Sequence, residues 1–340
     1  MLKTKDFDFN LPKELIAQKP IEPRDHSRLL AFHAQADLVE HKKFYDICDY
    51  LKAGDTLVLN RSKVIPARLI FDCEGKECEI FLLKNLEGFV YQALVRPGKL
   101  FKVGRKHIVA DGLECGVKEV SEEGTRVIEF SSDPLGYGLV PLPPYIENDE
   151  KDVFEKYQTV FAKEEGSVAA PTAGLHFTDA LLEKLKAKGV EIAEVVLHVG
   201  LGTFLPVKSE LLDEHKMHSE DYFVSEEAAA KLNKCVEDGR RIVAVGTTSV
   251  RVLESIYDEG FKAGEFSTNI FIYPGRYEWK VVDALITNFH LPKSTLIMLV
   301  ASFLESKGVK NSVERILNLY EEAIKEKYRF YSFGDATFIY

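Results

Sequence analysis

Three segments in the second half of the chain each run from an apolar strand through a short polar loop into a helix. They are SVAAPTAGLHFT (167–178), RIVAVGTTSVRVLESI (241–256) and LITNFHLPKSTLIMLVASF (285–303). Apolar strands that alternate with helices are typical of α/β folds. If the three strands lie in one sheet, their loops open at one edge, where helix N-termini present free N–H groups to ligands. The pattern therefore predicts an α/β fold with one ligand crevice.

The loops at these junctions carry side chains suited to anion binding and proton transfer. The candidates are His176 in the first loop, Thr247, Thr248, Ser249 and Arg251 in the second, and Asn288, His290, Lys293 and Ser294 in the third. A helix N-terminus lowers the pKa of a nearby imidazole, so His176 and His290 are expected to be neutral proton acceptors, or else capping or core histidines. Arg251 is either a clamp for a carboxylate or phosphate or the partner of Glu254 in a salt bridge.

Two further motifs lie between the first and second junctions. LHVGLGTFLPV (197–207) lacks the third glycine and the following helix of a dinucleotide fingerprint, which leaves a ligand loop with His198 at its base or a plain turn. HKMHSE (215–220) brings His218 close to Glu220 without an obvious further ligand, so we expect no metal. His218 and Glu220 are interpreted as a base or polar-group binder, or as surface residues.

The chain ends in the aromatic segment YRFYSFGDATFIY (328–340). It is expected to form a strand after the last helix. Most of its rings are expected to pack in the core. The turn at Asp335 could instead bring this carboxylate and a ring face to an aromatic ligand such as a base.

Residues 68 to about 147 differ in their sequence pattern from the rest of the chain. Short alternating runs are separated by turns at Gly88, Gly98, Gly112 and Gly124, a pattern typical of a small antiparallel barrel or sandwich. The proline-rich stretch 141–144 suits a linker. The sequence thus predicts an α/β main domain made of both ends of the chain, residues 1–66 and 148–340, with an inserted β domain at 67–147. Short helices are expected at Pro12–Gln18 and about Ser312–Lys327.

The amino-acid composition indicates the cellular compartment of the protein and the kinds of partner that it can bind. A hydrophobic content of 46% over 340 residues can fill two cores, and the absence of an apolar run near 18 residues predicts a cytoplasmic protein without a membrane span. The five cysteines have no zinc-ligand spacing, so reduced thiols and no metal are expected. A net charge of −10 argues against a protein that coats nucleic acid.

One local run of the sequence is positively charged although the net charge of the chain is negative. RPGKLFKVGRKH (96–107) contains no acid and carries Arg96, Lys99, Lys102, Arg105 and Lys106. It is either a patch that contacts a phosphate backbone or a solvated β-hairpin.

Several motifs together resemble one family, the S-adenosylmethionine:tRNA ribosyltransferase-isomerases of queuosine biosynthesis. They are DFDFNLPKELIAQKPIEPRDHSRLL, VIPARL, GSVAAPTAGLHFT, LHVGLGTF, MHSE, VAVGTTSVR, IFIYPG, TNFHLPKSTLIMLV and YRFYSFGDA, and they run from Asp6 to the end of the chain. The resemblance implies a barrel-like α/β main domain with an inserted small antiparallel β-barrel domain. It also implies a monomer that uses S-adenosylmethionine as co-substrate, with no bound cofactor.

The implied reaction moves and isomerises the ribosyl group of S-adenosylmethionine onto a 7-aminomethyl-7-deazaguanine at the wobble position of tRNA, giving epoxyqueuosine, adenine and methionine. A base must remove a proton next to the sulfonium, and adenine needs a proton as it leaves. The acid and base candidates are His176, His198, His218 and Glu220. The substrate-binding candidates are Thr247, Thr248, Arg251, His290, Lys293, Ser294 and Asp335.

Some positions depart from the family pattern, and two other functions remain open. Arg61, Ser62 and Lys63 replace the usual residues before VIPARL, and Asn269 stands where an acid often precedes IFIYPG. The junctions alone would also suit a hydrolase or base exchanger that binds a nucleoside without S-adenosylmethionine. The basic run would suit a non-catalytic RNA-binding module.

Overall fold

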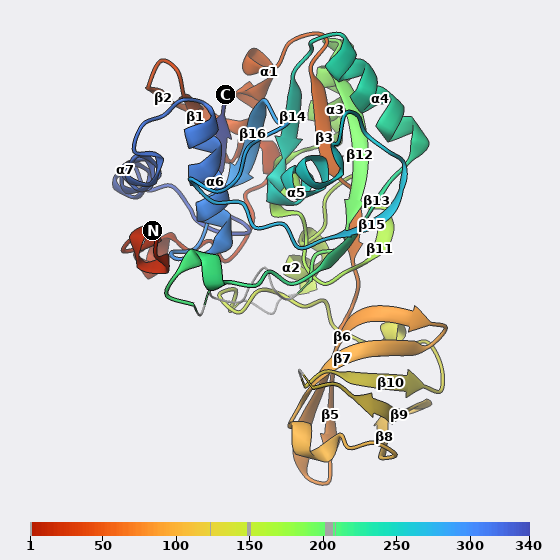
Figure 1. Cartoon of the computed structure of the whole chain (residues 1–340). Helices are drawn as coiled ribbons and strands as arrows, with labels where there is room; N and C mark the ends of the chain where they lie inside the picture. The colour runs from red at the N-terminus through yellow and green to blue at the C-terminus, as the bar shows by residue number, and fades with distance from the viewer. Residues whose placement is uncertain (1, 123, 148–150, 201–206, 208) are drawn as a thin grey trace.

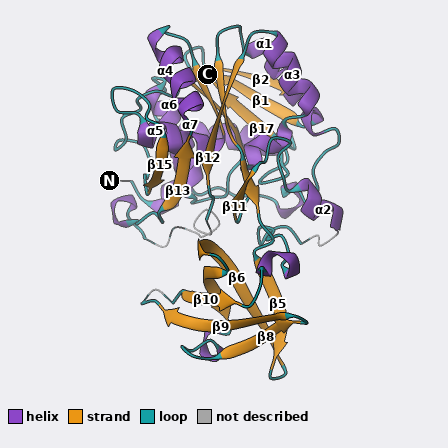
Figure 2. Cartoon of the chain, turned by 90° about the vertical axis from the view of Figure 1, so that its right-hand side faces the viewer, coloured by secondary structure: helices purple, strands orange, loops and turns teal. Residues whose placement is uncertain are grey.

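The computed structural model describes residues 2–122, 124–147, 151–200, 207 and 209–340. Figure 1 shows a large α/β body with a smaller body of strands attached to it, and Figure 2 shows the same division after a quarter turn. The confirmed fold class is therefore mixed α/β with an inserted antiparallel barrel. The division into 1–66 with 148–340 and 67–147 remains a proposal.

A nine-stranded sheet runs through the large body. Its central strands β12, β3, β14 and β16 are mutually parallel, and β17 pairs antiparallel with β16 and parallel with β1. Strands from both ends of the chain thus meet in one sheet. In spatial order the strands are β15 (Gly264–Thr268), β13 (Glu220–Val224), β12 (Glu191–Leu197), β3 (Thr56–Asn60), β14 (Ile242–Val245), β16 (Ala284–Asn288), β17 (Ala336–Ile339), β1 (Arg28–His33) and β2 (Leu38–Lys43).

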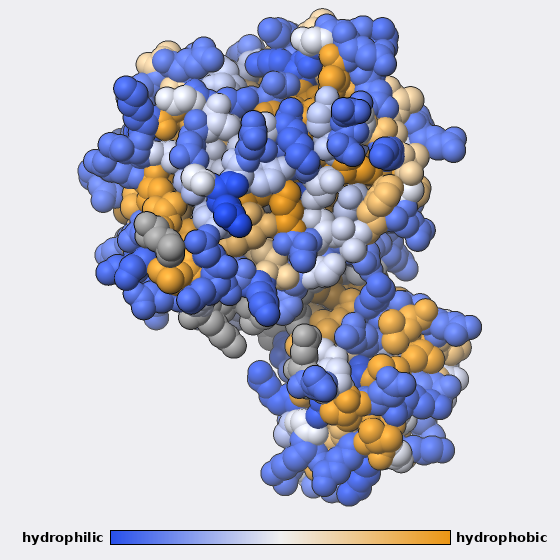
Figure 3. Space-filling model, in the orientation of Figure 1, coloured by the Kyte–Doolittle hydropathy of each residue, from blue (hydrophilic) through white to orange (hydrophobic). Residues whose placement is uncertain are grey.

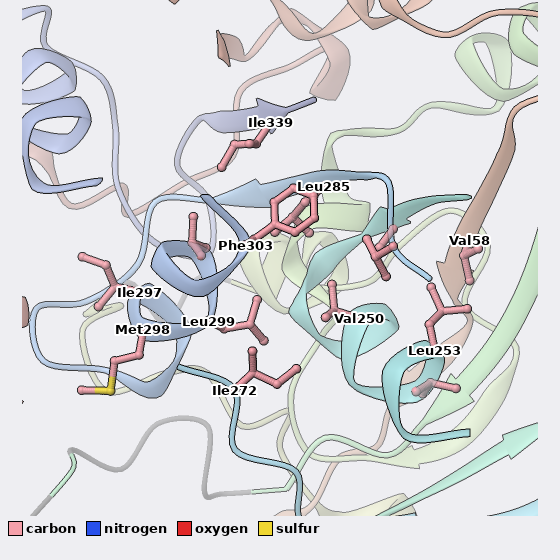
Figure 4. Close-up of a cluster of buried hydrophobic side chains, with 14 of the residues drawn as sticks. Val58, Val250, Leu253, Ile272, Leu285, Ile297, Met298, Leu299, Phe303 and Ile339 are labelled. Carbon is pink, nitrogen blue, oxygen red and sulfur yellow. The ribbon is translucent and has the colours of Figure 1, made fainter. Parts of the chain in front are cut away.

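Helices cover both faces of this sheet. Because neighbouring side chains of a strand point to opposite faces, Val58 joins the core beneath one set of helices while Leu57 and Leu59 join the other. Figure 4 shows the first core, in which Val250, Leu285 and Phe303 come together. The helices on this face are α4 (Glu226–Glu237), α5 (Gly246–Ile256), α6 (Thr295–Ser306) and α7 (Ser312–Lys325), and those on the other are α1 (Ile47–Tyr50) and α3 (Asp179–Ala187).

Burial on both faces explains the continuous apolar strands. All five residues of β3 and all four of β14 are buried, as expected for parallel strands between two helix layers. A fully buried strand shows no alternation in its sequence, so its length and its flanking turns are what mark it as a strand.

Hydroxyl side chains cap the first turns of α3 and α6. Thr178 caps α3 by accepting a hydrogen bond from the Leu181 N–H, and Ser294 caps α6 in the same way through the Ile297 N–H. The expected helix at Pro12–Gln18 is wrong. Only one 3-10 turn forms there, because Pro12 sits before it and Ile16 turns to an extended conformation.

The smaller body is one antiparallel sheet of six strands, with β5 beside β8 so that it nearly closes into a barrel. Its core includes Ile80, Ala93, Phe101 and Ile128. In spatial order the strands are β5 (Arg68–Cys73), β6 (Lys76–Glu87), β7 (Val90–Arg96), β10 (Arg126–Phe130), β9 (Leu113–Val120) and β8 (Lys106–Ala110).

β4 (Ser62–Val64) and β11 (Glu164–Ser167) form a separate two-stranded parallel sheet. In the chain, β4 comes before the barrel strands and β11 comes after them. Gly138 packs so closely on the Pro66 carbonyl that an added Cβ would lie 1.8 Å from its oxygen, so only glycine fits there. The remaining elements are α2 (Lys151–Lys156) and 3-10 turns η1 (Thr4–Phe7), η2 (Lys13–Leu15), η3 (Arg24–His26), η4 (Phe44–Asp46), η5 (Gly98–Leu100), η6 (Pro134–Tyr137), η7 (Thr172–His176) and η9 (Leu212–Glu214).

Candidate functional site

The three junctions meet around one small cavity. β14 and β16 are parallel neighbours, so the loops that follow them open at the same sheet edge. The first junction differs from the expectation, because β11 pairs with β4 outside the large sheet. Its η7 turn nevertheless packs beside β16 and α5. The lining residues include Thr172 and Ala173 of the first junction, Thr247 and Thr248 of the second, Asn288 and His290 of the third, and Tyr145, Tyr331 and Ser332.

The cavity is tight in this structure. Its volume is about 60 Å³, which is room for a few water molecules. Sites for drug-sized ligands usually measure about 300–1,000 Å³. A nucleoside could enter only if the lining residues moved apart.

Two buried polar atoms in the lining have no hydrogen-bond partner within the described part of the chain. They are Thr248 Oγ1 and Asn288 Oδ1. The Asn288 amide nitrogen is used, since it donates to the Tyr331 carbonyl at 3.1 Å. Unsatisfied buried polar atoms are rare and costly, so two of them facing one cavity indicate hydrogen bonds reserved for a ligand.

Two tyrosines form an aromatic wall. The rings of Tyr145 and Tyr331 are 4.6 Å apart between centroids, and the Tyr145 hydroxyl bonds to Ser332 Oγ at 2.7 Å. Tyr331 has a φ of 71°, a strained value for a tyrosine that is often found at functional sites. Burial raises the pKa of Tyr331 to about 12, so its phenol stays neutral.

Sequence reasoning missed both tyrosines. Tyr145 directly follows the proline-rich stretch 141–144, which suits a linker, and Tyr331 lies in the aromatic C-terminal segment, most of whose rings are expected in the core. The excess of aromatic residues in that segment was the available signal.

His290 is the predicted histidine that lines the cavity. Its Nε2 bonds to Thr287 Oγ1 at 3.0 Å, and its side chain is nearly fully buried. Burial lowers its pKa to about 3, so the imidazole is neutral at pH 7. The direction of the predicted shift agrees with the structure, but desolvation causes it.

His176 lies behind the cavity wall rather than in it. Its Nδ1 bonds to Ser27 Oγ at 2.8 Å, its Nε2 lies 3.2 Å from the Asn288 amide nitrogen, and its ring stacks on Phe44. Burial and then the positive charges of Arg329 and Arg24 lower its pKa to about 3. With both ring nitrogens engaged, His176 is arranged to hold Asn288 in place.

Glu220 and Arg251, predicted separately, form a buried ion pair with each other. Their side chains are 6% and 7% exposed. Glu220 Oε1 also accepts the Gly200 N–H at 2.9 Å, and Arg251 Nη2 donates to the Thr268 carbonyl at 3.3 Å. Arg251 begins the second turn of α5 rather than lying in its first, and Glu254 is occupied elsewhere by the Val281 and Val282 N–H groups.

His198 and His218 are not among the residues that line the cavity. His198 packs its ring against Gly166, and its buried Nδ1 has no partner. Burial lowers its pKa, although Asp221 opposes that shift. His218 is exposed. Residues 201–206 of the expected glycine loop lie outside the described residues.

Lys293, Ser294 and Asp335 also have partners other than a ligand. Lys293 Nζ makes a half-exposed ion pair with Asp8 at 2.7 Å, and Ser294 Oγ bonds to the Leu291 carbonyl while it caps α6. Asp335 is buried and accepts the backbone N–H groups of Arg28 and Arg329, both at 2.8 Å. It therefore fixes the C-terminal turn that carries Tyr331.

The basic run lies on the barrel surface. All five of its cationic side chains, Arg96, Lys99, Lys102, Arg105 and Lys106, are exposed. Among the described residues, only Arg105 of these has a recorded ion pair, a long one of 3.5 Å to Glu74. Figure 3 shows apolar patches on the barrel as well, and Val103 and Ile108 are among its exposed apolar residues.

Arg61 and Lys63, which depart from the family pattern, are used in ion pairs beside the two-stranded sheet. Arg61 contacts Glu164 and Glu194, and Lys63 contacts Glu165. Ser62 is buried between them and Asn269 is exposed.

Neither a metal centre nor a membrane span is found in the described part of the chain. Across residues 2–122, 124–147, 151–200, 207 and 209–340, no group of three or more His, Cys, Asp or Glu side chains is arranged to hold a metal ion. Within the same residues, every helix is too short or too polar to cross a bilayer.

A cavity at the carboxyl ends of parallel strands, with aromatic walls and unpaired polar atoms, is typical of the active site of an α/β enzyme. Residues 4–339 match the family described as Queuosine biosynthesis protein, and the chain belongs to that family. It is therefore an enzyme, as the resemblance implied.

Full-length relatives agree with this assignment. The chain is 53% identical to the S-adenosylmethionine:tRNA ribosyltransferase-isomerase of Clostridioides difficile, over 99% of this chain and 100% of the relative. It is also 53% identical to the protein of that name from Thermosipho africanus, over 100% of both chains. The crystal structure of S-adenosylmethionine tRNA ribosyltransferase from Thermotoga maritima is 43% identical, with a TM-score of 0.56 over 98% of this chain and 100% of that one.

Proposed function

We propose that the chain is a tRNA ribosyltransferase-isomerase that transfers and isomerises the ribosyl moiety of S-adenosylmethionine onto the 7-aminomethyl-7-deazaguanine at the tRNA wobble position. The products would be epoxyqueuosine-tRNA, adenine and methionine. The full-length family match, with relatives of that name at 51–53% identity, carries this proposal.

The sheet-edge cavity is the proposed site of the S-adenosylmethionine nucleoside. The Tyr145 and Tyr331 rings offer flat apolar surfaces on which a purine can stack. Thr248 Oγ1 and Asn288 Oδ1 offer unpaired polar atoms to its hydroxyl and amino groups. Because the cavity is only about 60 Å³, binding requires it to widen.

His290 is the proposed proton acceptor at this site. A proton must leave the ribose carbon next to the sulfonium, whose positive charge acidifies that carbon. In the tautomer that carries its proton on Nε2 toward Thr287, His290 has Nδ1 free to accept a proton. Among the described lining residues, His290 is the imidazole, and its neutral form is the one that can accept a proton.

The other candidate residues have supporting roles in this proposal. His176 orients Asn288, and the Glu220–Arg251 pair supports Gly200 next to the lining residue Val199. Thr247 contributes to binding, whereas Ser294 and Asp335 maintain the local structure. No chemical step is assigned to His198, His218 or Lys293.

The exposed basic run on the barrel is the proposed contact for the tRNA backbone. Phosphate binding needs clustered Lys and Arg side chains that can exchange their counterions, and these five are exposed. We also propose a cytoplasmic monomer with no bound cofactor or metal. Sedimentation of the purified chain at micromolar concentration tests its monomeric state.

Adenine release from S-adenosylmethionine tests the reaction. It should be measured with and without tRNA that carries the aminomethyl-deazaguanine, followed by mass analysis of the tRNA nucleosides. Release coupled to epoxyqueuosine formation is expected. Adenine release without any change in the tRNA would favour a hydrolase, and tRNA binding without any turnover would favour an RNA-binding module.

A further inference from the structure

The barrel gathers three of the five cysteines and one histidine. Cys73 Sγ lies 3.2 Å from His107 Nδ1, and the Cys73 side chain is near enough to Cys78 to raise the Cys78 pKa. Cys115 lies opposite His107 in the β8–β9 register. Two strand pairs that are separate in the sequence, β5–β6 and β8–β9, thus bring these groups together within the barrel.

The register aligns Cys73 with Cys78 on one face of the β5–β6 hairpin. Phe71 pairs with Cys78 and Cys73 pairs with Lys76, so the two cysteines occupy diagonal positions on the side that faces the barrel core. Cys73 lies next to the Glu74–Gly75 turn, where both residues have positive φ values, 56° and 77°. It is at the end of the hairpin, where a small shift disturbs the fewest contacts.

The thiols differ in accessibility. Cys73 is partly exposed, whereas Cys78 and Cys115 are buried at 0% and 3%. Burial, followed by the contact with Cys73, raises the pKa of Cys78 to about 11, and burial raises the pKa of Cys115 to about 12. Both buried groups therefore rest as thiols, and Cys73 is the thiol that a small reagent can reach.

His107 is suited to accept the Cys73 proton. Its ring is 8% exposed and packs against Phe101 at 4.6 Å. Burial and then the Arg105 charge lower its pKa, so the ring is neutral. Nε2 makes no hydrogen bond of good geometry, although the Leu100 backbone lies beside the ring. A proton on Nε2 near that backbone leaves Nδ1 as the acceptor that faces Cys73.

We propose that Cys73 is a peroxide-reactive thiol, that His107 accepts its proton, and that Cys78 converts the product to a Cys73–Cys78 disulfide. The Cys73 thiolate attacks one oxygen of hydrogen peroxide, so that an S–O bond forms and the O–O bond breaks. The leaving hydroxide takes the proton from His107 and departs as water. Sulfur is oxidised by two electrons to a sulfenic acid, and the peroxide is reduced.

The second step forms the Cys73–Cys78 disulfide. The Cys78 sulfur attacks Cys73 Sγ, the S–O bond breaks, and the leaving hydroxide takes the Cys78 proton as water. Two thiols and one hydrogen peroxide thus give one disulfide and two waters. Diagonal positions are wider than a relaxed disulfide needs, so the hairpin end must move and the bond should be readily reduced by dithiothreitol.

Hydrogen peroxide treatment followed by intact-protein mass spectrometry tests the disulfide. The wild-type chain is expected to lose two hydrogen atoms and to recover them with dithiothreitol. Cys73→Ser should lose none, and Cys78→Ser should stop at a sulfenic acid that dimedone labels on Cys73. Cys48→Ser and Cys235→Ser, which remove buried cysteines of the large body, are matched controls that should behave as wild type.

The rate of alkylation by iodoacetamide at pH 7 tests the role of His107. Cys73 is expected to react first, and His107→Asn should slow it about tenfold by removing the proton acceptor. An unchanged rate in a folded His107→Asn variant, or peroxide oxidation that spares Cys73, would overturn the proposal. Stoichiometric Zn²⁺ binding that Cys73→Ser abolishes would overturn it in favour of a metal site.

Discussion

The cavity at the sheet edge and the basic surface of the barrel present polar groups in opposite ways. Around the cavity the side chains are neutral and mostly buried, and two of their polar atoms lack partners among the described residues. On the barrel five cations are exposed to solvent. A small nucleoside is recognised by fixed hydrogen bonds in a dry site, whereas a polyanion is attracted by exposed charge. The difference agrees with the proposal that the cavity binds the nucleoside and that the barrel surface contacts the tRNA backbone.

Two ion pairs show the same contrast. Glu220 and Arg251 are 6% and 7% exposed, whereas Lys293 and Asp8 are 46% and 47% exposed. Breaking a buried pair leaves an uncompensated charge in the interior, but breaking an exposed pair returns both charges to water.

The largest effect is expected from the buried pair. Arg251→Met should lower the free energy of unfolding by about 3–5 kcal/mol, since Glu220 would remain buried and unpaired. Lys293→Met is the matched control and should cost at most about 1 kcal/mol. Urea unfolding of both variants checks this, and equal losses would abolish the contrast.

The buried histidines should make the fold sensitive to acid. Both His176 and His290 have a folded-state pKa lowered to about 3, whereas an unfolded histidine binds a proton below about pH 6.5. The unfolded state therefore binds more protons between those values, and stability is present above pH 6.5 and lost as the pH falls. Each histidine should contribute about 1.4 kcal/mol per pH unit in this window.

Urea titrations between pH 7 and pH 4 measure this slope. His176→Gln and His290→Gln should each make it shallower, while His218→Gln, at an exposed position, is the control. A slope that the two buried substitutions leave unchanged would contradict the assigned cause.

Thr248→Val should separate binding from stability. Thr248 Oγ1 has no partner in the free protein, so its loss should change unfolding by less than about 0.5 kcal/mol. Loss of a hydrogen bond to the substrate should lower kcat/KM for S-adenosylmethionine about tenfold. Ser255→Ala, which removes a hydroxyl bonded to Thr268 away from the lining, is a control for turnover. Unchanged turnover in Thr248→Val would remove this hydroxyl from the site.

The smallest effect on the fold is expected on the barrel. Charge reversal at Lys99, Lys102 and Arg105 should leave the free energy of unfolding within about 0.5 kcal/mol. It should make the dependence of log tRNA affinity on log salt concentration shallower by about 2 to 3. The control reverses three exposed lysines at the ends of α7, Lys310, Lys325 and Lys327. Filter binding at several salt concentrations distinguishes the two triple variants, and equal slopes would refute the patch.

Much of the architecture could be predicted because it depends on local patterns. The buried runs of β14 and β16 and the alternating strands of the barrel follow from short segments of sequence. The family was also identified correctly from whole motifs. The helix at Pro12–Gln18 was wrong because a short propensity signal competed with a turn that pairs with the C-terminal segment.

The contents of the site were harder to predict, because a pattern names a side chain without naming its partner. Glu220 and Arg251 are 31 residues apart and both looked ready for a ligand, yet they bind each other. Asp335 was a ligand candidate and instead holds two backbone N–H groups. Catalytic and binding roles for the remaining candidates stay predictions.

The sequence by itself determined the α/β class, the inserted barrel, the family and the three polar junctions, since local periodicity and contiguous motifs encode them. Tertiary structure decided which polar groups remain without partners. Tyr145 and Tyr331, and likewise Cys73 and His107, come from distant segments and meet only when the chain folds. Burial, which sets pKa values and leaves Thr248 Oγ1 and Asn288 Oδ1 unpaired among the described residues, is a property of the packed chain and not of any segment.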